Sequence, residues 1–165
     1  MRYAPFVSKR VTRTYRQSID APPERVFRLV CPVREAEWLD GWQHTMIHSQ
    51  SGLVEEGAVF STPSPGEQDT VWVVTRRDPV KRIVEFARFT PGSRVCLLRI
   101  AVRSDRRGRS LVDIAYTYTG ITAAGNAFVD GLSEEMFLKA VTFWEASMNH
   151  WLKTGQQLRK EQGVA

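Results

Sequence analysis

The sequence predicts an α+β fold in which an antiparallel sheet of about seven strands is covered by a long C-terminal helix. Three observations predict it. Seven segments rich in β-branched and aromatic residues lie between residues 10 and 119, and the later ones are separated only by short turns. Two proline-started helical segments follow the first of them. A stripe of large apolar residues at helical spacing then runs from Phe137 to Trp151.

The first strand is expected over residues 10–19, with two short helices after it. Asp20-Ala21-Pro22-Pro23 ends the strand because a proline pair cannot continue a ladder, but prolines suit the first turn of a helix. Pro32 stops this first helix and can start the second, which carries Trp38 and ends at Gly41.

Six further strands are expected over residues 43–50, 58–62, 69–77, 81–90, 94–104 and 110–119. The last two alternate clearly, with Cys96, Leu98, Ile100 and Val102 on one face of the first and Val112, Ile114, Tyr116 and Tyr118 on one face of the second. Because no helix separates these strands, the sheet is antiparallel. The patterns at 43–50 and 81–90 leave open which face points inward.

Helix returns at the C-terminal end. Residues 122–130 form a short helix, and Ser133 is placed to cap the long one, which runs to about residue 155 and spans ~35 Å. Its apolar stripe consists of Phe137, Val141, Trp144, Met148 and Trp151. A helix this amphipathic must lie on the sheet. The bulky side chains on both layers can either fill the space between them or wall an open pocket, and the pattern does not decide between these.

Length and composition limit the class of protein. The 165 residues suit one domain, and 42% hydrophobic with 25% charged residues argues against a disordered chain or a coiled coil. No run of 18 apolar residues is present, and the first ten residues lack the apolar core of a secretory signal. Cys31 and Cys96 form no CxxC motif and are expected as buried thiols, which predicts a cytoplasmic location.

The net charge of +5 is unevenly distributed. Residues 1–19 hold five basic and no acidic residues, and residues 76–109 hold eleven basic and three acidic ones. The two segments would form one positive face if they are neighbours in space. A solvated surface is the favoured interpretation. A contact with an anion, a lipid headgroup or a nucleic acid is the alternative.

Three stretches resemble a known superfamily. The run Ile19 to Phe27, a strand end followed by a proline-started helix, resembles the opening of SRPBCC proteins, which include START lipid-transfer domains, birch-pollen-allergen-type proteins and polyketide cyclases. Cys31 to Trp42, and Thr117 to Gly120 followed by Gly125 to Phe128, resemble a branch of uncharacterised bacterial members. The resemblance covers nearly all of residues 1–165. It implies the helix-grip fold, a sheet curved around the C-terminal helix, with an apolar cavity between them.

Ten residues are candidates for lining that cavity: Trp42, Met46, His48, Trp72, Phe86, Tyr116, Tyr118, Phe137, Val141 and Trp144. Tyr116 and Tyr118 share a face and combine an apolar wall with hydroxyl donors that can orient a ligand. His48 shares a face with Met46 on a regular strand, from which it could orient a polar group or transfer a proton. Each tryptophan could equally be plain core.

The sequence gives less support for a metal site, for a catalytic acid or base, and for the common enzyme motifs. His44 and His48 would be about 13 Å apart on a strand, too far for one metal ion, so no metal site and no cofactor are expected. Glu85 would be an acid or base with a raised pKa if it faced inward, but exposure is favoured. The nucleotide-binding, zincin and serine-hydrolase motifs are absent from the sequence.

The leading hypothesis is therefore binding or transport of a small hydrophobic ligand that is lipid-like, aromatic or polyketide-like. The alternative is a cyclase, aromatase or dehydratase that uses the same cavity, and a deep titratable group with a shifted pKa would favour it. A second alternative is a co-chaperone-like interaction module with a filled core. The small ligand is the expected partner, a nucleic acid is disfavoured, and a homodimer is left open. The SRPBCC resemblance supplies no strict catalytic signature, so no catalytic residue is assigned.

Overall fold

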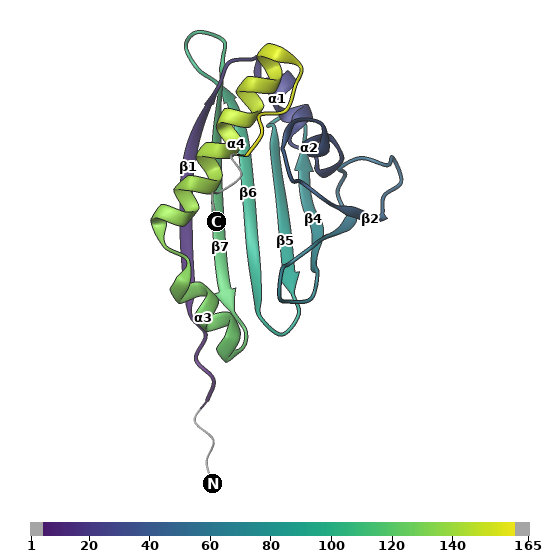
Figure 1. Ribbon diagram of the computed structural model, residues 1–165. Helices are drawn as coiled ribbons and strands as arrows, with labels where there is room; N and C mark the ends of the chain where they lie inside the picture. The colour runs from purple at the N-terminus through teal and green to yellow at the C-terminus, as the bar shows by residue number, and fades with distance from the viewer. Residues whose placement is uncertain (1–4, 161–165) are drawn as a thin grey trace.

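The computed structural model describes residues 5–160 and contains one antiparallel sheet packed against helices (Figure 1). The strand order is β1-β7-β6-β5-β4-β3-β2. The strands are β1 (Arg10–Ile19), β2 (Thr45–His48), β3 (Val59–Thr62), β4 (Thr70–Asp78), β5 (Ile83–Thr90), β6 (Arg94–Ser104) and β7 (Ser110–Gly120). The helices are α1 (Pro23–Leu29), α2 (Pro32–Trp38), α3 (Ala123–Gly131) and α4 (Glu134–Thr154). This confirms the predicted α+β class and element order.

The long helix α4 begins and ends as its sequence predicts. The Ser133 hydroxyl accepts a hydrogen bond from the Met136 amide at 3.1 Å, and Gly155 ends the helix in the left-handed conformation with φ of 72°. The helix lies along the β1 edge of the sheet (Figure 1).

Side chains on the inward face of β1 hold this helix and the segment before it. The buried Gln17 amide donates to the Val141 carbonyl at 3.0 Å, and Arg13 donates to the Leu132 carbonyl at 3.1 Å. Asn149 of α4 donates in turn to the Ser18 carbonyl at 3.0 Å. These bonds fix the position of α4 relative to β1, at one side of the sheet.

The tightest core lies where α1, α2 and the second half of α4 meet the sheet. Trp38 is fully buried, donates its indole N–H to the Leu29 carbonyl at 3.1 Å, and stacks on Trp144 with ring centroids 6.0 Å apart. Ile100, Ile114 and other fully buried apolar side chains complete this cluster from the sheet. The stacked tryptophans therefore fix the middle of α4 against α2.

The short helix α3 packs closely on the end of β7. Thr122 caps it by accepting from the Gly125 amide at 3.1 Å. A Cβ atom added to Gly125 would lie 1.7 Å from the Ser93 carbonyl oxygen, so only glycine fits there. Asn126 donates to the Val7 carbonyl and accepts from the Lys9 amide, which ties the start of β1 to α3.

The structure settles two faces that the sequence left open. On β5, Val84 and Phe86 are buried while Glu85 points outward and pairs with Arg99 at 3.2 Å, as the favoured interpretation had it. On β2, the expected alternation of Met46 and His48 is wrong because a bulge lies between them. Met46 pairs with the buried Phe60, whereas His48 pairs with Val59 on the other face.

Within residues 5–160, no helix is long and apolar enough to cross a membrane.

Candidate functional site

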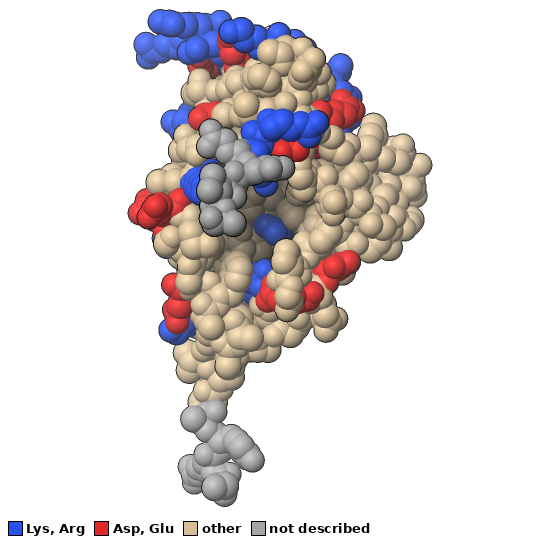
Figure 2. All heavy atoms as spheres, in the orientation of Figure 1, with Lys and Arg blue, Asp and Glu red and all other residues tan. Residues whose placement is uncertain are grey.

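A cavity of about 1380 Å³ lies between the sheet and α4 and opens to the surface. Its floor comes from β3 to β7 and its walls from α2, α4 and residues 158–160. Figure 2 shows the corresponding hollow, with Lys or Arg atoms inside it. The helix and sheet therefore enclose a space that their own side chains leave unfilled.

The strand register aligns the floor side chains in two adjacent rows. One row crosses five strands through Phe60, Trp72, Arg88, Cys96 and Tyr118. The next contains Phe86, Leu98 and Tyr116. The rings contact one another. Phe60 and Trp72 stack at 5.1 Å, Phe86 meets Trp72 edge-on at 5.7 Å, and Tyr116 and Tyr118 lie parallel at 5.8 Å. The floor is thus a mainly aromatic surface that also contains Leu98, Ile100 and a single arginine.

Arg88 lies within this aromatic floor. Its guanidinium carbon is 4.0 Å from the centroid of the Trp72 ring and 5.8 Å from that of Tyr116, both at cation–π distance. Its Nε atom is buried and has no hydrogen-bond partner. Within residues 5–160, no carboxylate lies within ion-pair distance of it. The cavity therefore contains a positive charge without a counter-charge from the described chain.

The titratable groups near Arg88 hold their protons at neutral pH. Burial raises the pKa of Glu35, on α2, from 4.5 to about 8, although the Arg88 charge acts against this shift. Burial likewise raises the pKa of Tyr116, Tyr118 and Cys96 above their ordinary values. At pH 7 these groups are mainly neutral, so they can donate hydrogen bonds but do not neutralise Arg88.

The mouth of the cavity is basic. Lys139, Arg159 and Lys160 line it and are exposed. Asp40 is paired there with Arg159 at 2.8 Å and accepts from the Lys160 amide. Since the Glu35 carboxyl is mainly protonated, the lining carries a net positive charge at pH 7.

Eight of the ten residues predicted to line the cavity do lie on it: Trp42, Trp72, Phe86, Tyr116, Tyr118, Phe137, Val141 and Trp144. Met46 is half-buried beside the core and is not part of the lining. His48 is exposed outside the cavity because of the bulge in β2, so its proposed roles in orienting a ligand or moving a proton lose their geometric basis.

Sequence reasoning missed the two polar groups that distinguish this cavity. Arg88 follows Phe86 by two residues on the same strand, so the alternation that places Phe86 inward also places Arg88 inward. Glu35 precedes Trp38 by three residues on α2 and lies on the same side of the helix. Both signals were present in the sequence, but charged residues are ordinarily assigned to solvent.

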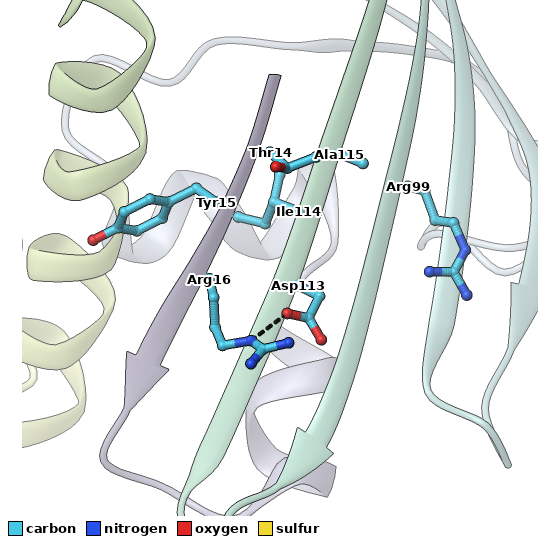
Figure 3. Close-up of a pocket in the computed structure, with 7 residues that line it drawn as sticks. All are labelled: Thr14, Tyr15, Arg16, Arg99, Asp113, Ile114 and Ala115. Carbon is cyan, nitrogen blue, oxygen red and sulfur yellow. Dashed lines mark hydrogen bonds and ion pairs between the residues drawn. The ribbon is translucent and has the colours of Figure 1, made fainter. Parts of the chain in front are cut away.

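A second, shallow hollow of about 490 Å³ lies on the other face of the sheet, over β1, β7 and β6 (Figure 3). Arg16 and Asp113 point toward each other there and pair at 2.6 Å, and Asp113 also pairs with Arg103 at 3.2 Å. The basic N-terminal and middle segments are therefore neighbours across β7, but the Asp113 carboxylate between them neutralises part of their charge.

Comparison with known proteins gives matches among solved structures alone. No protein-family model and no curated protein matches the chain. It is similar to an uncharacterised protein from Rhizobium leguminosarum, with 13% identity over 89% of this chain and 97% of that one and a TM-score of 0.62. Norcoclaurine synthase from Thalictrum flavum matches with 12% identity over 90% and 88% of the two chains and a TM-score of 0.63.

A third similar structure is Ara h 8.0201, with 10% identity over 88% of this chain and 99% of that one and a TM-score of 0.62. The TM-scores of these three matches demonstrate a shared fold, but sequence identities this low do not transfer a function. Together with the observed topology, they show that this chain has the helix-grip fold.

Proposed function

We propose that this protein binds a small, mainly apolar molecule in the cavity between the sheet and α4. The observation that carries the proposal is a cavity of about 1380 Å³ bordered by Phe60, Trp72, Phe86 and the two tyrosines of β7. Ligand sites are typically concave and apolar, with a few polar groups that fix orientation. This cavity has both features.

Affinity would come mainly from removing apolar ligand surface from water. Burial contributes roughly 25 cal/mol per Å², so a ligand that buries about 300 Å² gains roughly 7 kcal/mol before the costs of association are subtracted. A planar or elongated molecule would contact the aromatic floor on one side and α4 on the other. The size class and the apolar character of the ligand follow from these contacts.

Native mass spectrometry after gentle purification tests the proposal, combined with titration of an apolar fluorescent probe, 1-pyrenebutanol. We expect either a co-purified small molecule or saturable probe binding at about one site per chain. Ala140→Trp should abolish probe binding by placing a large ring in the cavity, because Ala140 lines it. Lys153→Trp is the matched control, since Lys153 lies on α4 outside the lining. Equal probe binding by both variants would contradict the proposal.

An acid–base enzyme on the same cavity is the second candidate, and the Glu35 carboxyl is the observation that favours it. A group with a pKa of about 8 that faces an apolar cavity can both donate and accept a proton near neutral pH. This suits cyclisation or dehydration of a polyketide-like substrate. The co-chaperone-like alternative required a filled core, which a cavity of about 1380 Å³ does not fit.

The enzyme candidate is tested by incubating the protein with a β-polyketone thioester and following cyclised or dehydrated products by mass spectrometry. Glu35→Gln should lower the rate by about 100-fold or more, the usual contribution of a general acid or base. Glu37→Gln, on the exposed side of the same helix, should leave the rate unchanged. Rates equal to the uncatalysed background with the original protein would exclude this candidate for that substrate class.

A further inference from the structure

We propose that Arg88 binds an ionised carboxylate, so that the ligand of this cavity is an organic acid with an apolar body. The inference rests on the proposed function and specifies the polar group of its ligand. It follows from the position of Arg88 in the floor of a cavity that is otherwise mainly apolar.

Arg88 lacks a counter-charge. An arginine side chain stays protonated at all ordinary pH values, and the half-buried Arg88 has lost part of its contact with water without gaining an ion-pair partner. The Trp72 and Tyr116 rings attract the guanidinium of Arg88 but cannot replace an anion. No carboxylate of residues 5–160 lies within ion-pair distance of Arg88, and the Glu35 carboxyl, which its charge does influence, is mainly protonated at pH 7. An anionic ligand group would therefore complete the site.

Several polar side chains that line the cavity can donate hydrogen bonds at pH 7. The Nε of Arg88 and the Nε1 of Trp144 are both buried without a partner, and both residues line the cavity. Glu35, Tyr116 and Tyr118 retain their protons at pH 7. A carboxylate accepts hydrogen bonds and donates none, which makes it complementary to this set.

The entry route to the cavity is positively charged. Lys139, Arg159 and Lys160 at the mouth bear the same sign as Arg88 at the floor. A positive lining favours entry of an anion and disfavours a cationic amphiphile. The apolar body would then lie on the Phe60, Trp72 and Phe86 rings while its acid group reaches Arg88.

A matched pair of fluorescent probes tests the inference: 1-pyrenebutyric acid and 1-pyrenebutanol, which differ in the acid group. At pH 7 the protein should bind the acid at least 10-fold more tightly than the alcohol, since a charge-assisted pair of hydrogen bonds is lost in the alcohol. Arg88→Met should weaken acid binding at least 10-fold and change alcohol binding less than 3-fold. Arg88→Lys should retain part of the preference, because it keeps the charge but not the bidentate geometry.

Arg99→Met is the control variant, because Arg99 lies on the other face of the sheet and is paired with Glu85. It should leave both affinities unchanged. If the original protein binds acid and alcohol equally, or if Arg88→Met weakens both to the same extent, the inference is overturned while the proposed function stands. If neither probe binds and no small molecule co-purifies, the proposed function fails as well. The comparison of the two probes on the original protein needs no variant, so misfolding of Arg88→Met would not weaken the test.

Discussion

The protonation of Glu35 couples the chemistry of the cavity to the stability of the fold. Its carboxyl has a pKa of about 8 in the folded protein, against an ordinary value of 4.5. Between these two pH values the unfolded chain has released this proton while the folded protein still holds it. The folded state binds more protons there, so its stability falls as the pH rises from 4.5 to 8 and is constant with respect to this group outside that window.

Glu35→Gln removes this pH dependence. We expect the variant and the original protein to have similar unfolding free energies near pH 4, and the variant to be more stable by about 1–3 kcal/mol at pH 8. Urea denaturation at pH 4, 6 and 8 measures the difference. Glu37→Gln, on the exposed side of α2, is the matched control and should follow the original protein within about 0.5 kcal/mol. A Glu35→Gln difference that does not grow with pH would contradict the shifted pKa.

Arg88 is expected to lower the stability of the ligand-free protein while it favours binding of an acidic ligand. Replacing its uncompensated charge by a side chain of similar length, Arg88→Met, should raise the unfolding free energy of the ligand-free protein by about 1–3 kcal/mol. Chemical denaturation at pH 7 measures this, with Arg99→Met as a control that loses only an exposed ion pair. A protein that becomes more stable and binds the acid less well would show that Arg88 serves the ligand. Marked destabilisation would assign it a structural role instead.

At the scale of secondary-structure elements, the backbone of α3 packs directly against the turn before β6 at Gly125. Gly125→Ala would place a methyl group 1.7 Å from a backbone oxygen, and neither α3 nor the Ser93 segment can rotate away as a side chain would. We expect a loss of about 2–4 kcal/mol in unfolding free energy, measured by thermal and urea denaturation. Gly131→Ala, in the same helix with no atom within 4 Å of the new methyl group, should change stability by less than about 1 kcal/mol. Equal effects of the two substitutions would contradict the close contact.

Elements with strong local signals could be predicted from the sequence, and those that depend on tertiary contacts could not. Three local signals are each compatible with only one backbone conformation. They are the alternation in β6 and β7, the prolines that start α1 and α2, and the Ser133 cap of α4. The bulge in β2 has no such signal, because four residues allow either register. It changed the face of His48 and removed that residue from the cavity.

At the scale of the whole molecule, the cavity itself was the feature that the sequence left undecided. Trp72, Tyr116 and Trp144 can interlock or stand apart, depending on where α4 is fixed. Its position is set by polar groups of β1 and α4, above all Gln17 and Asn149, and by the stack of Trp144 on Trp38. A sequence pattern predicts that the helix covers the sheet, but the separation of the two layers is a property of these long-range contacts.

The charge distribution of the whole molecule predicts how fast an acidic ligand enters. The mouth residues Lys139, Arg159 and Lys160 act over a screening length of about 20–30 Å at low salt but only about 4 Å at 0.5 M. In stopped-flow fluorescence, the association rate constant of 1-pyrenebutyric acid should fall several-fold between 20 mM and 500 mM NaCl, while that of 1-pyrenebutanol stays nearly constant. Lys139→Ala should reduce the salt dependence for the acid, whereas Lys153→Ala, on α4 outside the lining, should reduce it less. The same salt dependence for both probes would show that the mouth charges do not steer the acid, and the positive lining would then act on the bound state alone.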